Sequence, residues 1–569
     1  MDAGDVSLGP LPRFVSVNIP NLHYIEDDFR FEAAERYRLP NEFEIRDALE
    51  AVRQMGGGVV RIYALSVRKP TDGPRVIRHV TGPGQFDSRA FEALDLVLAL
   101  CREYGVKVII PFVDNWRWWG GVAEYAAFRS KSPNAFWSDP ELIADFERTV
   151  EYVVHRVNTL NGVRYADDPT ILAWETGNEL QSPWSWVETV AHYLKQQDPK
   201  HPVIDGYHSA TIRPEALDSE LIDVLSTHHY DGAAAMQRDI RANLEQIAGK
   251  KPYFVGEFGF MPANELAPVL TDAFARGLQG ALIWSLRFRN RDGGFYFHAE
   301  KPGFEAYHWP GFASGDGYEE RAIMKLLAAE ATRLAGVAAP GQAKPHPPIM
   351  LPSLPVAISW QGAAGAETYS VERAQSSSGP WQILAIGVSD AERGYRPLYN
   401  DTSIVPGQSY YYRVVAHNGS GDSEPSNVLG PVSSQTLRFV DELVDARFMS
   451  RHEGPLKFVS SSPSDTKMDR DRAAGAGSIL EYHVAGEIRE IRVDAFLRGD
   501  AATPRLESTE AKGQLKLTLS RFEPGTDSSP DVHPVRITGT APWGTHGFRI
   551  ELGPKAELGR VECDYLPRQ

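Results

Sequence analysis

The chain has 569 residues, of which 42% are hydrophobic and 24% are charged, a composition typical of globular rather than disordered proteins. This length exceeds what one hydrophobic core usually serves, so we expect two to four domains. The formal net charge of −16 disfavours nucleic acid as a partner, and no apolar run reaches the roughly 20 residues that cross a bilayer.

Up to about residue 335, short apolar runs alternate with amphipathic stretches. The runs are apolar on both faces, as expected of strands in a parallel sheet that is covered on both sides. Eight of them are present, at residues 14–19, 59–65, 107–112, 171–175, 203–208, 223–230, 252–258 and 281–286. Eight such units predict an α/β fold, the (β/α)8 TIM barrel, over residues 1–336. A doubly wound sheet is the main alternative, but no glycine-rich phosphate loop follows the first run.

Three stretches between these runs have apolar residues at helical spacing. Residues 88–105 begin with Ser88 and end with a glycine, and residues 139–158 have Asp139 as the expected cap before a proline. Residues 235–249 repeat the pattern. We expect a helix at each of these places.

The composition changes near residue 335. Residues 337–348 are rich in proline and alanine and are expected to form a linker. Strand-like runs separated by polar turns follow, which predicts a small β-sandwich at 349–433 and a second all-β sandwich at 434–569. The two cysteines, Cys101 and Cys563, are poor candidates for a disulfide, and no metal-ligand spacing surrounds either.

Two glutamates stand at the ends of predicted barrel strands. Glu179 follows the fourth run in "ILAWETGNELQSP", and Glu257 ends the seventh in "YFVGEFGF". The carboxyl ends of the strands build the active site of a TIM barrel, and an ionised carboxylate in apolar surroundings is costly without partners. One such acid could equally be structural, but two at two strand ends favour a catalytic pair. Glu175 is expected to point to the other side of its strand turn and to be structural.

Polar and aromatic residues also occur at other predicted strand ends. The candidates for substrate binding are Arg61, Asn115, Trp116, Asn178, His228, Tyr230 and Trp284. Single loop tryptophans more often serve packing, but five in two loops indicate flat apolar surfaces for sugar rings. These five are Trp116, Trp118, Trp119, Trp184 and Trp186.

A catalytic metal is a less favoured alternative. His228 and His229 are adjacent, but neighbours on a strand point to opposite faces, and no His-x-x-x-His or cysteine pair supports them. A serine hydrolase is less favoured still, because no G-x-S-x-G motif occurs. We therefore expect no metal and no other cofactor.

Taken together, these residues resemble glycoside hydrolase family 5, and within it the endo-β-1,4-mannanases. The resemblance covers roughly residues 12–330 and is carried by several motifs in the family's order and spacing. These are "VNIPNL", "VVRIYAL", "FDSRAFEALDLVLALCREYGVKVIIPFVDNW", "RVNTLNGVRYADDPTILAWETGNE", "IDVLSTHHY" and "VGEFG". Residues 406–426 and Trp360 are similar to a fibronectin type III module. The last region resembles a galactose-binding-type β-sandwich, as in many carbohydrate-binding modules, and a packing or spacer role is an equally open alternative to sugar binding.

The resemblance implies a retaining hydrolase of β-1,4-mannosidic bonds, with Glu179 as acid/base and Glu257 as nucleophile. It implies that Asn178 contacts the sugar 2-hydroxyl and that Arg61 and Tyr230 hold the nucleophile. It also assigns to the substrate site His228, Trp284, Asn115 and Trp116. We expect the pKa of Glu257 to be kept low by its partners and the pKa of Glu179 to be raised by the nearby charge and aromatic rings.

Two features depart from the family's pattern. Leu180 stands where proline usually follows Asn-Glu, and residues 287–312, after the eighth run, are longer and more basic than in a typical endo-mannanase. A loop of this kind can wall off one end of a cleft, so an exo-acting β-mannosidase and a β-glucanase are open alternatives. A non-catalytic carbohydrate-binding protein on a barrel scaffold is the alternative of another class.

The expected partner is a β-mannan polysaccharide or oligosaccharide, and the oligomeric state is left open. Residues 1–14 have neither the basic start nor the apolar core of a signal peptide. A secreted or periplasmic protein whose signal peptide is absent from this chain is the expectation.

Overall fold

The computed structural model describes residues 11–26, 37–301, 304–312, 319–336, 343–392, 394, 396–460, 471–510, 515–521 and 532–568. They fall into two compact units. The first includes Glu35–Phe288 and Ala306–Ala343, and the second includes Arg289–Glu305 and Lys344–Gln569. Residues 337–342 of the expected linker lie outside the described residues.

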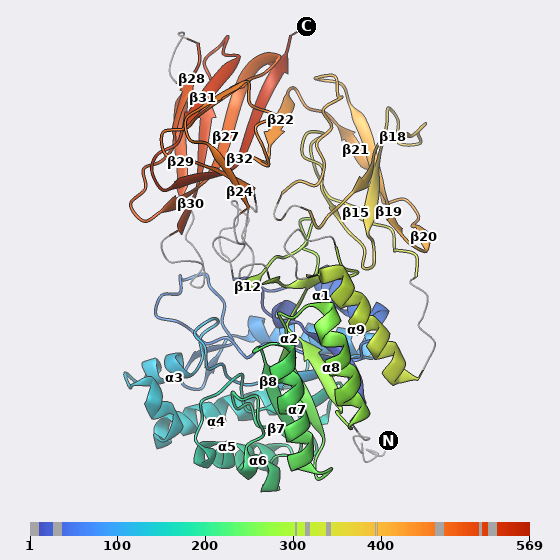
Figure 1. The fold of residues 1–569 in the computed structure, drawn as a ribbon, viewed down its shortest axis with the longest axis vertical. Helices are drawn as coiled ribbons and strands as arrows, with labels where there is room; N and C mark the ends of the chain where they lie inside the picture. The colour runs from blue at the N-terminus through green and yellow to red at the C-terminus, as the bar shows by residue number, and fades with distance from the viewer. Residues whose placement is uncertain are drawn as a thin grey trace. The chain divides into compact units, whose positions relative to one another are not determined.

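A parallel sheet of eight strands forms the centre of the first unit, with helices packed around it (Figure 1). Along the sheet the order is β7-β6-β5-β2-β1-β10-β9-β8, and a further parallel bridge between Ile204 and Val224 links its two ends. The strands are β1 (Phe14–Asn18), β2 (Val59–Arg61), β5 (Lys107–Pro111), β6 (Ile171–Glu175), β7 (Val203–Ile204), β8 (Leu225–His229), β9 (Tyr253–Phe258) and β10 (Gly280–Ile283). The predicted (β/α)8 TIM barrel is confirmed.

The expected helices are present, with ends set by capping residues. In α2 (Ser88–Tyr104) the cap is Asp87 rather than Ser88, because the Asp87 carboxylate accepts from the Arg89 backbone N–H at 3.1 Å. Gly105 ends this helix with a left-handed φ of 69°. In α4 (Pro140–Val154) the Asp139 carboxylate accepts from the Glu141 N–H at 3.0 Å, as predicted.

The other elements of the first unit complete the barrel's outer layer and loops. The α-helices are α1 (Glu42–Gln54), α3 (Val122–Phe128), α5 (Trp184–Gln197), α6 (Pro214–Asp218), α7 (Ala233–Ile247), α8 (Ala263–Ala275) and α9 (Glu320–Ala335). The short elements are η1 (Pro20–Leu22), η2 (Pro133–Trp137), η3 (Tyr165–Asp167), β3 (Val80–Gly82), β4 (Gln85–Phe86), β11 (Leu286–Arg287) and β14 (Tyr307–His308). Among the described residues, none of the helices combines the length and apolarity that a membrane span requires.

The inside of the barrel is apolar at one end and aromatic at the other. Phe14, Val59, Ile109, Phe254 and Leu282 belong to one buried cluster and come from five different strands. A second cluster follows the carboxyl ends of the strands and contains Tyr24, Tyr63, Trp118, Trp119 and Trp284. Fully burying one such side chain contributes about 1.5–3 kcal/mol. Because both clusters are closely packed, they hold the residues between them in fixed positions.

The second unit is built of antiparallel β-sheets, so β domains follow the barrel as expected (Figure 1). One sheet joins β18-β17-β19-β20 with β21, another joins β24-β25-β32-β27-β30-β29 with β22, and a third joins β23-β26-β31-β28. Side chains of β19 (Tyr410–Asn418) alternate between buried and half-buried, the pattern of a sheet with one face on a core. That core includes the fully buried Trp360.

The remaining strands of this unit follow in chain order. Those of the first part are β12 (Ala299–Lys301), β13 (Phe304–Glu305), β15 (Ile349–Met350), β16 (Trp360–Gln361), β17 (Thr368–Ala374), β18 (Gln382–Val388), β20 (Gly421–Asp422) and β21 (Leu429–Val432). Those of the last part are β22 (Leu437–Asp441), β23 (Arg451–Glu453), β24 (Lys457–Ser460), β25 (Asp471–Ala474), β26 (Ile479–His483), β27 (Gly486–Arg498), β28 (Arg505–Ser508), β29 (Lys516–Arg521), β30 (Val532–Thr540), β31 (Gly547–Glu551) and β32 (Ala556–Pro567).

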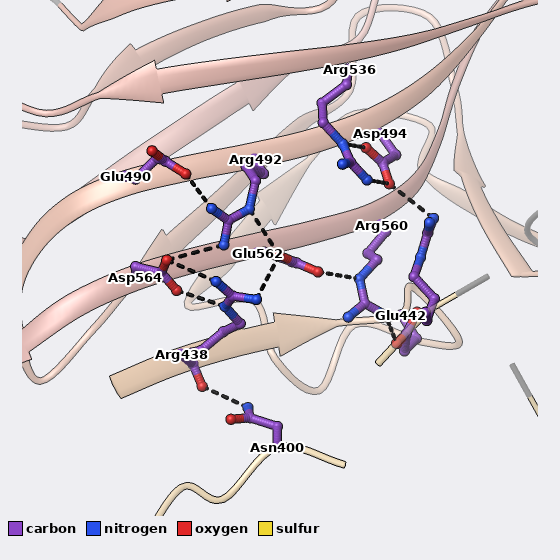
Figure 2. A network of polar contacts seen from close by, with 11 residues as sticks. Asn400, Arg438, Glu442, Glu490, Arg492, Asp494, Arg536, Arg560, Glu562 and Asp564 are labelled. Atoms are coloured by element: carbon purple, nitrogen blue, oxygen red, sulfur yellow. Dashed lines mark hydrogen bonds and ion pairs between the residues drawn. The ribbon is translucent and has the colours of Figure 1, made fainter. Parts of the chain in front are cut away.

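A network of paired charges lies on one face of the sheet that contains β22, β27 and β32 (Figure 2). Arg438 Nε lies 2.7 Å from Asp564 Oδ1, and Arg492 bridges Asp564 and Glu562 at 3.0 Å each. Burial raises the pKa of Glu562, but the surrounding arginines outweigh burial and hold it well below its usual range. The Asn400 amide donates to the Arg438 carbonyl oxygen at 2.9 Å, so the network also ties a loop of the preceding β region to this sheet.

Candidate active site

Glu179 and Glu257 come together at the carboxyl ends of the barrel strands. Glu257 is the second-last residue of β9, and Glu179 lies four residues beyond β6. One carboxylate oxygen of each, together with a ring nitrogen of His228, lie within 4.8 Å of one another. Both glutamates are buried, with 8% and 3% of their surface exposed. In glycosidases, carboxyls about 5–5.5 Å apart fit covalent double displacement, whereas about 6.5–9.5 Å leaves room for a water.

Three donors surround the carboxylate of Glu257. The Arg61 Nη1 atom lies 2.7 Å from Oε1, and the Tyr230 hydroxyl donates to Oε2 at 2.6 Å. His228 Nδ1 is 3.4 Å from the same Oε2. A Cβ on Gly256 would lie 2.9 Å from His228 Nε2 and 2.4 Å from Ser226 Oγ, so a glycine is needed beside the imidazole.

Glu179 has its own set of partners. The Trp116 indole N–H donates to Oε2 at 2.6 Å, and His228 Nδ1 lies 2.9 Å from Oε1. His208 Nε2 is 3.6 Å from the same oxygen. The backbone of Glu179 is left-handed, with φ of 50°, a conformation that costs a residue other than glycine about 1–3 kcal/mol. The strain is offset by the hydrogen bonds that hold the carboxylate in this position.

A fully buried arginine connects the two strand ends. Arg61 binds Glu257 through Nη1 and Glu175 through Nε at 2.7 Å, and its Nη2 atom donates to Asn178 Oδ1 at 2.8 Å. The expectation that Glu175 points away from the site is therefore wrong, because Glu175 and Glu257 share one guanidinium. Buried charges require such pairing. An arginine within an apolar strand was therefore the feature of the sequence that could have predicted a second acid near Arg61.

Sequence reasoning also missed Asp114. It lies three residues beyond β5, is fully buried, and accepts hydrogen bonds from Asn178 and from the Tyr63 hydroxyl. The signal for it was a carboxylate directly after the apolar run "VIIPFV". Burial raises the pKa of Asp114 to about 8.

The pKa directions in the carboxylate pair are the reverse of the expectation. Burial favours a raised pKa at Glu179, but the His228 hydrogen bond and charge, with His208 and Trp116, outweigh it and lower the Glu179 pKa to about 2. Burial and the charge of Glu179 raise the pKa of Glu257, in spite of His228, Arg61 and Tyr230. The expectation failed because it did not include the indole and imidazole donors that face Glu179.

His228 carries the charge that links the two acids. Burial opposes protonation of its ring, but Glu257 and Glu179 outweigh burial and raise the His228 pKa above the ordinary 6.5. Its neighbour His229 is turned away, bonds Thr227 Oγ1 at 2.8 Å, and has a pKa lowered by burial to about 3. The two histidines therefore face opposite sides of the strand, as predicted.

The remaining candidates, Trp284 and Asn115, contact other residues of the site. Trp284 is 7% exposed, and its ring packs beside Tyr63 at a centroid distance of 5.8 Å. The Asn115 backbone N–H donates to the Asn178 carbonyl oxygen at 3.1 Å, and Asn115 itself is half-buried.

Of the five tryptophans expected in loops, Trp184 and Trp186 lie in α5 instead, and Trp116 is the most exposed of the five, at 43%. Trp118, Trp119 and Trp186 are buried, so the expectation of sugar platforms is wrong for these three. The buried rings pack among other aromatic side chains; for example, Trp186 lies 5.6 Å from Phe136 and 5.2 Å from Trp137.

Glu179, His228 and Glu257 also have the donor types of a metal site. One of these three residues is already engaged, because Arg61 and Tyr230 bind the two oxygens of Glu257. The arrangement is chemically suited to placing one proton and one ionised carboxylate on either side of a bond.

Residues 30–231 match the family model described as "GH family 5 beta-mannosidase-like". The chain is 29% identical over 313 residues to "Putative mannan endo-1,4-beta-mannosidase 5" of Oryza sativa subsp. japonica, which covers 45% of this chain and 61% of that protein. It is 30% identical over 274 residues to "Mannan endo-1,4-beta-mannosidase 3" of Solanum lycopersicum, which covers 40% of this chain and 65% of that protein. The chain thus spans less than two thirds of the length of these curated relatives.

Among solved structures, the chain is similar to the endo-β-1,4-mannanase from Thermotoga petrophila, with 19% identity and a TM-score of 0.47 over 74% of this chain and 99% of that chain. The barrel is assigned here from its own strand order. The family match and the curated relatives show a similarity in sequence within the barrel, to GH family 5 beta-mannosidase-like proteins over residues 30–231 and to mannan endo-1,4-beta-mannosidases.

Proposed function

We propose that the chain is a retaining glycoside hydrolase that cleaves β-1,4-mannosidic bonds of mannan or mannooligosaccharides. The observation that carries the proposal is the pair of buried carboxylates, Glu179 and Glu257, with oxygens within 4.8 Å of each other beyond the strand ends of a TIM barrel. The sugar is inferred from the relatives, which are named mannan endo-1,4-beta-mannosidases.

In the first step, Glu257 attacks the anomeric carbon while Glu179 protonates the departing glycosidic oxygen. The bond between the anomeric carbon and that oxygen breaks, and an ester bond to Glu257 forms. Arg61 and Tyr230 fix the two oxygens of Glu257, so the attacking atom has little freedom to move.

Glu179, Glu257 and His228 together hold the proton that this step needs. In the unliganded site, His228 carries the proton and both carboxylates are ionised, in keeping with the raised His228 pKa and the low Glu179 pKa. The distance of 2.9 Å between His228 Nδ1 and Glu179 Oε1 lets the proton pass to Glu179 without rearrangement. Glu179 becomes an acid when a sugar excludes water from the site.

In the second step, Glu179 acts as the base that removes a proton from water. The water attacks the anomeric carbon, the ester bond to Glu257 breaks, and the sugar leaves with its original β configuration. We assign Asn178, Asn115, Trp116 and Trp284 to binding of the sugar.

Release of reducing sugar from mannan tests the proposal. We expect activity on β-mannan or mannooligosaccharides, none in Glu257→Ala, and full activity in Glu188→Ala, a matched control in the exposed part of α5. Binding to mannan without hydrolysis would instead support a non-catalytic binding protein. Product profiles on mannan, glucomannan, cellulose and aryl β-mannosides separate endo action, exo-β-mannosidase and β-glucanase.

We further propose that residues 349–433 form a fibronectin type III-like module and that residues 434–569 form a β-sandwich that binds carbohydrate. A polysaccharide substrate also favours a secreted or periplasmic location. To test the carbohydrate-binding module, the inactive Glu257→Ala protein is bound to insoluble mannan and mannohexaose is added to fill the cleft. A protein that stays bound supports binding by the module, and complete release by mannohexaose contradicts it. Fractionation of the source cells tests the location.

A further inference from the structure

We infer that Asp114 is a positioning residue, which turns the side-chain amide of Asn178 so that its oxygen faces the sugar 2-hydroxyl. The inference rests on the proposed function. Asp114 Oδ1 accepts from Asn178 Nδ2 at 3.1 Å, and Oδ2 accepts from the Tyr63 hydroxyl at 2.9 Å. The Tyr63 oxygen is itself 3.3 Å from Asn178 Nδ2.

The hydrogen-bonding capacity of Asn178 is almost fully used by these partners. A side-chain amide has two N–H donors and two lone pairs on its oxygen. Both donors are directed to Asp114 and Tyr63, and one lone pair accepts from Arg61 Nη2 at 2.8 Å. The capacity that remains is one lone pair on Oδ1. Asn178 therefore meets a sugar as an acceptor, and the 2-hydroxyl donates to it.

Asp114 makes this orientation the favoured one. A reversed amide would place the Asn178 oxygen against an oxygen of Asp114 and its N–H groups against the Arg61 guanidinium. Both contacts would be repulsive inside a buried site, where unpaired polar groups are costly. Without Asp114, only Arg61 and Tyr63 would remain to orient the amide.

The backbone around Asp114 is fixed independently of its side chain. The Asn178 N–H donates to the Val113 carbonyl oxygen at 2.7 Å, and the Asn115 N–H donates to the Asn178 carbonyl oxygen at 3.1 Å. These bonds join the loops after β5 and β6. A change at the Asp114 side chain should therefore alter the orientation of one amide and leave the loops joined.

The protonation state of Asp114 suggests a matched pair of variants. With the Asp114 pKa raised to about 8, the carboxyl is mainly neutral at pH 6. Oδ1 accepts from Asn178 in either protonation state. The Tyr63 hydroxyl donates to the ionised Oδ2, and it turns to accept from Oδ2 when that oxygen carries the proton. An asparagine at this position has the same acceptor and donor in the same places, so Asp114→Asn preserves the arrangement and Asp114→Ala removes it.

The experiment compares two substrates in each variant. One is an aryl β-mannobioside, and the other lacks the 2-hydroxyl on the sugar at the cleaved bond. We expect the ratio of kcat/KM between them to be about 100-fold in the wild type, because a hydrogen bond to this hydroxyl strengthens in the transition state. Asp114→Ala should reduce the ratio to less than about 10-fold, and Asp114→Asn should keep it within about 3-fold of the wild type.

A general loss of structure would lower both rates and leave the ratio unchanged, so the ratio separates positioning from folding. An unchanged ratio in Asp114→Ala, or an equal collapse in Asp114→Asn, overturns the inference. If Asp114→Ala does not fold, Asp114→Leu, which also lacks the acceptor but fills the space, takes its place, and an unchanged ratio there overturns the inference as well. A wild type inactive on the complete substrate refutes the proposed function, whereas an active wild type with an unaltered Asp114→Ala ratio refutes only the role of Asp114.

Discussion

The hydroxyl of Tyr230 provides a direct test of how Glu257 is kept ionised. It donates to Glu257 Oε2 at 2.6 Å, and the Tyr230 ring stacks on Phe260 at a centroid distance of 5.2 Å. Tyr230→Phe removes the hydroxyl and keeps the ring. The variant should therefore leave the packing unchanged and weaken only the ionised form of Glu257.

The size of the effect follows from the hydrogen bond. A bond to a charged group contributes about 1.5–3 kcal/mol, and 1.36 kcal/mol corresponds to one pKa unit, so the Glu257 pKa should rise by about 1–2 units. The proposed nucleophile must be ionised, so the acidic limb of kcat/KM should move by about the same amount to higher pH. On that limb the variant should be about 10- to 100-fold slower than the wild type, and the difference should shrink as pH rises.

The assay is the pH profile of kcat/KM on mannohexaose. The matched control is Tyr125→Phe, since Tyr125 is also buried and its hydroxyl bonds Thr149 Oγ1 at 2.8 Å, in α3 rather than beside Glu257. The control should keep the wild-type acidic limb. If Tyr230→Phe folds normally and its acidic limb stays in place or moves to lower pH, the assigned role of this hydrogen bond is wrong.

Three further predictions concern the same site. Glu179→Ala should slow cleavage of mannan about 100-fold or more but slow 2,4-dinitrophenyl β-mannobioside much less, because a good leaving group needs no proton; equal losses would argue against an acid role. His228→Asn should move the basic limb of kcat/KM to lower pH, because the raised His228 pKa holds the shared proton above pH 6.5 in the wild type; a limb that stays in place would count against the shared proton. Because the His228 pKa is raised in the folded protein, protonated His228 stabilises the fold fully below pH 6.5, the pKa of the unfolded chain. This stabilisation is lost as the pH rises through the pKa of the folded protein. The melting temperatures of the wild type and His228→Asn should therefore converge as the pH rises above 6.5. Arg61→Met should lower the free energy of unfolding by about 3–5 kcal/mol, because Glu175 and Glu257 lose their buried counter-charge; urea unfolding measures this, and a loss below about 1 kcal/mol contradicts it.

The barrel was predictable because its strands are apolar on both faces. The eight runs in the sequence correspond to β1, β2, β5, β6, β7, β8, β9 and β10, although several strands end earlier than the runs, as β7 does at Ile204. The N-cap of α4 at Asp139 and the end of α2 at Gly105 were predicted from local bonds, whereas the N-cap of α2 is Asp87 and not the predicted Ser88. Local signals of this kind are readable without tertiary contacts.

The candidate site was predictable in its members and less so in its electrostatics. Glu179 and Glu257 were found because both stand at the ends of apolar runs, and the geometry brings them together as expected. The pKa directions depend on which donors face which oxygen, for example the Trp116 indole on Glu179. Such contacts arise between loops far apart in the sequence. For the same reason Asp114 was missed and Glu175 was expected to point the wrong way, since their partners come from other strands.

Trapping of the covalent intermediate tests the central claim most directly. The full chain would be incubated with 2,4-dinitrophenyl 2-deoxy-2-fluoro-β-mannobioside and digested, and the labelled peptide would be sequenced by mass spectrometry. A burst of one dinitrophenol per chain with the sugar attached to Glu257 is the predicted result. Attachment to another residue, or an unlabelled chain that still hydrolyses mannan, would contradict double displacement through Glu257.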